Sequence, residues 1–230
     1  DRSFNDNDFI EFVGIRNMGG KHREVSQEDE PYNEYLGRYT DTTTYWLTWG
    51  GSKGKRVFIA LPNIDGISDT LEYYSEVQHF EENIWFDHSE ANLINRELPY
   101  WNKNKTWGHN WIGVGIQNKG FQANNIYPNA TAKLFIKLQD FSSDIVDRAH
   151  LLALSLNSEE ERYDSTYIDK YEHVVLQADV PSSQFNEGSN TLKIHSYQTL
   201  ATINNCFFDW YEIEYPRYLI PLEDSLKFTF

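Results

Sequence analysis

Cysteine is scarce in this 230-residue sequence, which contains only Cys206. A single cysteine excludes an internal disulfide and any zinc site built from several cysteines. Cys206 precedes two phenylalanines and has no cationic neighbour in the sequence that would lower the pKa of its thiol. We therefore expect Cys206 to be buried and inert, as free cysteines commonly are, and not to be a nucleophile.

Basic residues and long apolar runs are also scarce. The chain has 20 Lys and Arg against 35 Asp and Glu, for a formal net charge of −15. Binding to a nucleic-acid backbone needs a patch of Lys or Arg, so this balance argues against a nucleic-acid partner. It also disfavours an anionic membrane surface. No apolar run approaches the roughly 20 residues of a membrane span.

The chain begins at Asp1 instead of an initiator methionine, and no signal-peptide pattern follows. We expect the sequence to represent a mature form or an excised fragment. The low cysteine content leaves the compartment open.

Aromatic residues, in contrast, are abundant, with 7 Trp, 15 Tyr and 14 Phe. Such an excess is typical of β-rich proteins. About ten segments have the composition or alternation of strands, and none has convincing helical periodicity. The clearest are residues 72–80, 132–138, 149–156, 174–180, 192–195 and 206–215. The sequence therefore predicts an all-β, jelly-roll-like antiparallel sandwich.

The last of these segments, residues 206–215, is the strand around which we expect the rest of the sandwich to be built. Period-two alternation divides it into two faces. One face would carry Phe207, Asp209, Tyr211, Ile213 and Tyr215, and the other Cys206, Phe208, Trp210, Glu212 and Glu214. Pro216 cannot donate a ladder hydrogen bond, so we expect pairing to stop there.

The first part of the chain is predicted to be an N-terminal arm. Residues 1–60 include a hairpin signature, in which an aromatic segment at 41–49 turns through glycines into residues 55–60. We expect this arm to pack on a main body formed by residues 61–230, or to belong to a single domain with it.

Three segments resemble a known family. Residues 6–14 place an acidic turn before an Ile-Glu-Phe strand, and residues 31–49 place a Pro-Tyr step and a Thr-Asp before an aromatic strand. Residues 188–217 look like the closing strands of a galactose-binding-like jelly roll. Together they resemble the region preceding the catalytic domain of gingipain-family cysteine peptidases, including the sortase-like peptidases of bacterial type IX secretion.

The resemblance implies a non-catalytic role. In that family the catalytic His and Cys belong to a separate caspase-like domain, and nothing in this sequence matches it. The resemblance implies that this chain is not itself an enzyme and packs against, or positions, a downstream catalytic domain of the same protein. It also implies export to the bacterial cell surface or secretion, with the periplasm as an alternative.

An aromatic loop offers a different function. Its aromatic residues are Tyr100, Trp101, Trp107 and Trp111. Exposed indoles could stack on a sugar while nearby Asn and Lys bond its hydroxyls, which would make the chain a carbohydrate-binding module or a peptide platform. Alternatively, these rings anchor the loop to the body or pack on a neighbouring domain.

Carboxylates suggest two further sites. Calcium prefers oxygen ligands, and no other cofactor is expected. The candidate calcium ligands are Asp6, Asp8, Asp41, Asp65 and Asp69, with solvated loop carboxylates as the alternative. Glu212 and Glu214 lie about 6–7 Å apart along one strand face, a spacing compatible with glycosidase chemistry but also with an ordinary outward face.

Overall fold

The computed structural model describes residues 14, 42–46, 71–82, 84–87, 106–140, 148–168, 173–201 and 205–221. Eleven strands occur in these ranges. They are β1 Tyr73–Glu81, β2 Trp85–Asp87, β3 Thr106–Gly108, β4 Asn110–Ile112, β5 Gly115–Ala123, β6 Thr131–Asp140, β7 His150–Leu156, β8 Asp164–Ile168, β9 His173–Pro181, β10 Gly188–Tyr197 and β11 Cys206–Tyr218. A 3-10 turn, Ser182–Gln184, follows β9.

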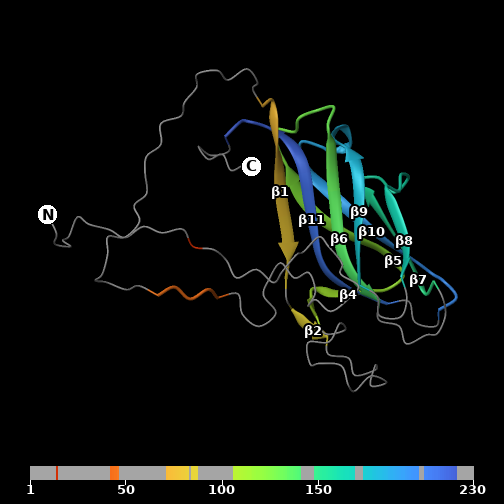
Figure 1. Cartoon of the computed structure of the whole chain (residues 1–230). Helices are drawn as coiled ribbons and strands as arrows, with labels where there is room; N and C mark the ends of the chain where they lie inside the picture. Colours follow the sequence, from red (N-terminus) through yellow and green to blue (C-terminus); the bar gives the residue numbers. More distant parts are fainter. Residues whose placement is uncertain are drawn as a thin grey trace.

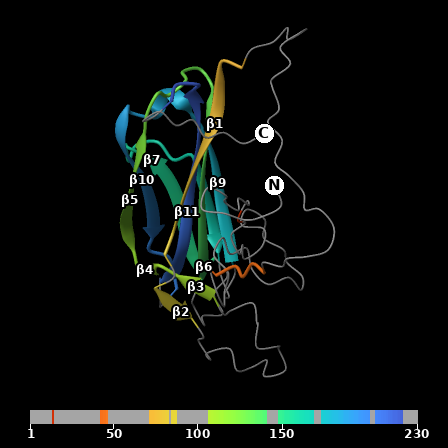
Figure 2. The same cartoon turned by 90° about the vertical axis from the view of Figure 1, so that its left-hand side faces the viewer.

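Two antiparallel sheets form the sandwich (Figure 1). One has the strand order β1–β11–β6–β9, with β4 also pairing with β11, and the other has the order β5–β10–β7–β8. Figure 2 shows the two sheets as adjacent layers, while β2 and β3 pair separately at one end. The neighbours within each sheet are mostly distant in sequence, as in a jelly roll. This arrangement confirms the predicted all-β sandwich.

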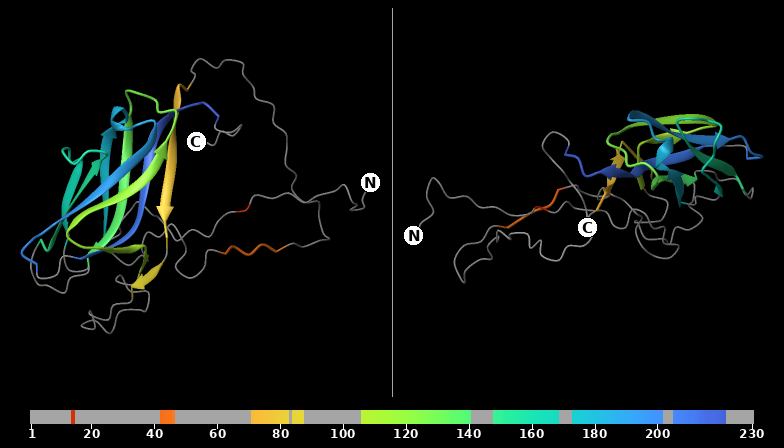
Figure 3. Two further views of the ribbon diagram at one scale, coloured as in Figure 1. Left: turned by 180° about the vertical axis from the view of Figure 1, so that it is seen from behind. Right: turned by 90° about the horizontal axis from the view of Figure 1, so that it is seen from above.

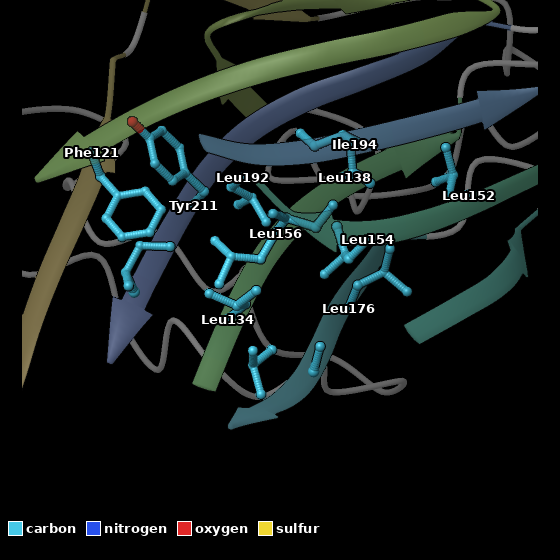
Figure 4. Packing of buried hydrophobic residues seen from close by; sticks show 14 of the residues in the cluster. Phe121, Leu134, Leu138, Leu152, Leu154, Leu156, Leu176, Leu192, Ile194 and Tyr211 are labelled. Carbon is cyan, nitrogen blue, oxygen red and sulfur yellow. The ribbon is translucent and has the colours of Figure 1, made fainter. Parts of the chain in front are cut away.

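The core lies between the two sheets (Figure 4). Strand β6 alternates as predicted and directs Leu134, Ile136 and Leu138 inward, where all three are fully buried. Strands β7 and β10 of the opposite sheet contribute further leucines and isoleucines. Full burial of each such side chain is worth roughly 1.5–3 kcal/mol relative to exposure. The alternation of β6 therefore determines which of its faces meets the second sheet.

A β-bulge in β11 corrects the predicted division of its faces. The register between β11 and β6 shifts between Phe208 and Tyr211. An extra residue in one strand reverses the inside–outside pattern on either side of it. The core therefore receives Cys206 and Phe208 together with Tyr211, Ile213 and Tyr215. The prediction was right for the residues after the bulge and wrong for those before it.

Pro216 does not end β11, which continues to Tyr218. The carbonyl of Pro216 accepts a hydrogen bond from the backbone N–H of Tyr127. In a strand, the N and O of one residue point to the same side, so the missing donor of Pro216 faces away from β1. Its pairing with Ser75 on β1 therefore loses nothing. The expected stop at Pro216 was wrong for this reason.

The expected hairpin of the N-terminal arm falls largely outside the described residues. Residues 42–46, within its first predicted strand, have no regular secondary structure. Trp46 is 89% exposed. β-Propensity reflects packing against neighbouring strands, and an exposed indole gains little from it. The division of the chain at residue 60 stays a prediction.

Candidate functional site

The clearest surface feature lies at the end of the sandwich where β1 begins and β11 ends. Tyr73 and Tyr218 are partners across the ladder between these strands. The ring of Tyr127 bridges them, stacking on Tyr73 at 4.4 Å between centroids and meeting Tyr218 edge-on at 5.2 Å. Figure 3 shows that the chain enters β1 and leaves β11 at this same end.

Apolar side chains extend this cluster. Leu71, Tyr73, Tyr218, Leu219 and Ile220 are between 37% and 71% exposed. With Tyr127 they form what we call the tyrosine patch. Contiguous exposed apolar surface on a soluble domain commonly marks a site of interaction with another protein.

Hydrogen bonds fix the backbone and rings around the tyrosine patch. Arg217 donates to the hydroxyl of Tyr74 at 2.8 Å and to the carbonyl of Ile220 at 3.3 Å. Burial, followed by the hydrogen bond to Glu76, raises the pKa of Tyr74 to about 12, so the phenol stays neutral. The hydroxyl of Tyr127 donates to the carboxylate of Glu72. The tyrosine patch is thus held in place by polar contacts beneath and beside it.

A buried polar cluster occupies the opposite end of the ladder between β1 and β11. Pairing places His79 directly across from Glu212. The Nδ1 atom of His79 lies 3.0 Å from Glu212, and its Nε2 atom lies 3.2 Å from Glu81. The exposed fractions of the three side chains are 6% or less. Both ring nitrogens are engaged, so the cluster resembles a structural clamp more than an acid–base catalyst.

The charge on His79 gives the clamp a pH dependence. Burial lowers the pKa of His79, but the hydrogen bonds and charges of Glu212 and Glu81 outweigh it, so the pKa lies above 6.5. The folded protein then keeps a proton that the unfolded chain releases. The stability from His79 is complete below about pH 6.5 and is lost as pH rises through the raised pKa. We expect the difference in unfolding free energy between wild type and His79→Gln to shrink above pH 6.5.

His195 serves as a control, because its pKa is shifted in the opposite direction from that of His79. Burial, then the charge of Arg162, lowers its pKa below 6.5. The difference between wild type and His195→Gln should therefore grow as pH rises through the window below 6.5. Urea unfolding of the three proteins between pH 5 and 8 makes the comparison. Equal slopes for the two variants would contradict the assigned environments.

The paired glutamates of β11 have partners in the structure. Glu212 contacts His79, and the hydroxyl of Ser75 donates to Glu214 at 2.9 Å. Glu212 is fully buried. These contacts do not place either carboxylate beside an open cleft. They therefore favour a structural role for the pair over glycosidase chemistry.

The candidate nucleophiles are enclosed. Cys206 is fully buried, as expected, and burial, followed by the charge of Asp140, raises the pKa of its thiol. A thiolate there is strongly disfavoured. The Oγ of Ser155 lies 2.7 Å from Nε2 of His195, a pairing seen in some catalytic sites, yet both residues are buried in the sheet. Neither group can meet a substrate in this conformation.

Only part of the predicted aromatic loop belongs to the described residues. Trp111 lies on β4, is 40% exposed, and packs its ring 4.8 Å from that of Phe207. The backbone of Trp107 pairs with Phe86 between β3 and β2. Tyr100 and Trp101 lie outside the described residues. The contact of Trp111 with Phe207 agrees with the anchoring interpretation for this one ring.

The predicted calcium ligands Asp6, Asp8, Asp41, Asp65 and Asp69 also lie outside the described residues. Within the ranges that the structure describes, no group of three or more His, Cys, Asp or Glu is arranged to hold a metal ion. Those ranges also include no helix long and apolar enough to cross a membrane.

Comparisons with known proteins found a likeness of fold. No family model and no curated protein sequence matches the chain. Among solved structures, the chain is similar to dimeric latent PorU from Porphyromonas gingivalis, with a TM-score of 0.50 and 10% sequence identity. The match covers 67% of this chain and only 14% of that PorU chain. At this identity, the likeness concerns the fold alone.

Proposed function

We propose that this chain is a non-catalytic β-sandwich region of a gingipain-like bacterial cysteine peptidase. In this proposal it packs against, and positions, a catalytic domain of the same protein, which is exported to the cell surface or secreted. The chain itself carries no peptidase activity. Its partner is the downstream domain, and no cofactor is needed for this role.

The tyrosine patch carries the proposal. It lies where β11 delivers the chain to Pro221, so a domain attached there would meet the exposed rings first. Aromatic residues are enriched in the buried centres of protein interfaces. Arg217 holds Ile220 in place, which reduces the ordering cost of docking.

Two further observations support the proposal. The only cysteine is buried and its thiol is held in the neutral form, so it does not suit a thiol peptidase. The fold is similar to a 14% portion of PorU. Both agree with the sequence resemblance, in which the β-sandwich precedes a separate catalytic domain.

Hydrogen exchange on the full-length protein and on the 230-residue chain tests the proposal. We expect residues 71–74 and 218–220 to be protected more strongly in the full-length protein, because the catalytic domain covers them. Replacing Tyr73 and Tyr218 by serine should reduce that added protection. Leu200→Ser is the matched control, since Leu200 is 93% exposed near the start of β11, at the opposite end.

Two results would overturn the proposal. Equal protection of these residues in the two proteins would exclude docking at the tyrosine patch. Thiol-dependent cleavage of a peptide by the isolated chain, lost in Cys206→Ala, would show that the chain is an enzyme itself.

A further inference from the structure

A pocket of about 350 Å³ opens between β1 and β5, the neighbouring edge strands of the two sheets. This volume is at the lower end of the range for ligand sites, so it suits a small group. Its lining residues are His79, Phe80, Glu81, Glu82, His109, Asn118, Lys119, Gly120, Phe208 and Tyr211. None of them belongs to the tyrosine patch.

The aromatic floor of the pocket is already engaged. The ammonium of Lys119 lies over the ring of Phe208, 4.1 Å from its centroid. Phe80 and Tyr211 stack on each other at 4.5 Å with an interplanar angle of 8°. The hydroxyl of Tyr211 donates to the carbonyl of Gly120 at 2.9 Å. A sugar would need an open ring face for stacking, and these contacts occupy one face of each of the three rings.

Besides His79, two basic side chains line the wall. His109 is anchored by its backbone N–H, which donates to the carbonyl of Phe208 at 2.9 Å. Lys119 is half-buried, and no carboxylate among the described residues forms an ion pair with it. Burial lowers the pKa of Lys119, and burial followed by the Lys119 charge lowers the pKa of His109. The charge of Glu82 acts in the opposite direction on both groups, and burial outweighs it for each.

Two acidic side chains, Glu81 and Glu82, also face the pocket. Glu81 is hydrogen-bonded to His79. Glu82 lies 3.5 Å from Nδ1 of His109, but its side chain is 65% exposed and well screened. These two glutamates repel a doubly charged phosphate more strongly than a singly charged carboxylate, whose one charge the Lys119 ammonium can balance.

We propose that this pocket binds a small organic carboxylate, which pairs with Lys119 and accepts a hydrogen bond from His109 above the Phe208 ring. The carboxylate can be a free acid or the C-terminus of a peptide. Charge-assisted hydrogen bonds of this kind are about twice as strong as neutral ones.

Titration of the His109 ring by NMR tests the proposal on the 230-residue chain. N-acetylglycine, which mimics a peptide C-terminus, and acetate, a free acid, are added separately at constant ionic strength. We expect both to raise the pKa of His109 in a saturable way, because a bound anion favours the imidazolium. N-acetylglycinamide, the neutral counterpart, should have no effect. Tighter binding of N-acetylglycine than of acetate would identify a peptide terminus as the source.

Lys119→Met tests the role of the ammonium group. The methionine side chain can still cover the ring of Phe208, but it carries no charge. Without ligand, this variant should show a raised His109 pKa, which checks that it is folded and that the two groups are neighbours. The carboxylate effect should then weaken at least tenfold. Lys193→Met, which removes an amine on β10 that pairs with Glu159, should behave as wild type. An unchanged His109 pKa with both acids, or an equal effect of galactose, overturns the proposal.

Discussion

Replacing Leu154 by alanine is expected to lower the free energy of unfolding by about 2–5 kcal/mol. Leu154 lies in the middle of β7, is fully buried, and belongs to the cluster between the two sheets (Figure 4). Its truncation removes apolar contacts and leaves a cavity that the opposite sheet cannot fill without moving. The loss should exceed that of any single surface substitution, because sandwich stability rests on this layer.

Leu200→Ala is the matched control for this measurement. Leu200 is 93% exposed, so the same chemical change should alter stability by less than about 0.5 kcal/mol. Urea unfolding, followed by tryptophan fluorescence and far-UV circular dichroism, measures both variants. A Leu154 variant as stable as the Leu200 variant would mean that the two sheets do not pack as described.

The sequence predicts a strand best where apolar and polar residue types alternate along it. In β6, the inward Leu134 and Ile136 alternate with Lys133, so period two appears directly in the residue types. Strand β8 was missed because its residues are mostly polar and half-exposed. An edge strand that buries little has no strong hydrophobic alternation to reveal it.

The faces of β11 were harder to predict, because both are buried. Phe207 and Phe208 are adjacent, point to opposite faces, and are almost fully buried. Hydrophobicity therefore cannot decide which one faces the second sheet. The bulge decides which phenylalanine faces the second sheet, and it arises from the pairing of β11 with β6. That pairing joins segments distant in the sequence, so the residues of β11 alone do not reveal it.

The candidate sites depend on register in the same way. The sequence drew attention to Glu212 because of its neighbour Glu214, but not because of His79, which is 133 residues away. Only the antiparallel pairing of β1 with β11 brings them together. For the tyrosine patch a weak signal was present, since Tyr218, Leu219 and Ile220 form an apolar run just after Pro216. The contribution of Tyr127 could not be foreseen.

The second large effect is expected at Asn190, whose side chain joins two turns. Its Oδ1 accepts from the backbone N–H of Asn186 at 2.8 Å and from Nδ2 of Asn157 at 3.0 Å. Its Nδ2 donates to the carbonyls of Asn186 and Gly188 at 2.8 and 3.0 Å. Asn190 is 1% exposed, so water cannot easily replace these bonds. We expect Asn190→Ala to lower the free energy of unfolding by about 1–3 kcal/mol.

The partner turn strengthens this expectation. Asn157 adopts a left-handed backbone conformation with φ of 57°, and its Oδ1 accepts from the backbone N–H of Thr191 at 2.9 Å. Loss of the Asn190 side chain therefore loosens the turn after β7 as well as the one before β10. Hydrogen exchange at the Asn186 amide should accelerate in Asn190→Ala, while Asn118→Ala, an exposed change on β5, should alter neither stability nor exchange. If the Asn190 variant matched the Asn118 variant, the two turns would not be coupled through this amide.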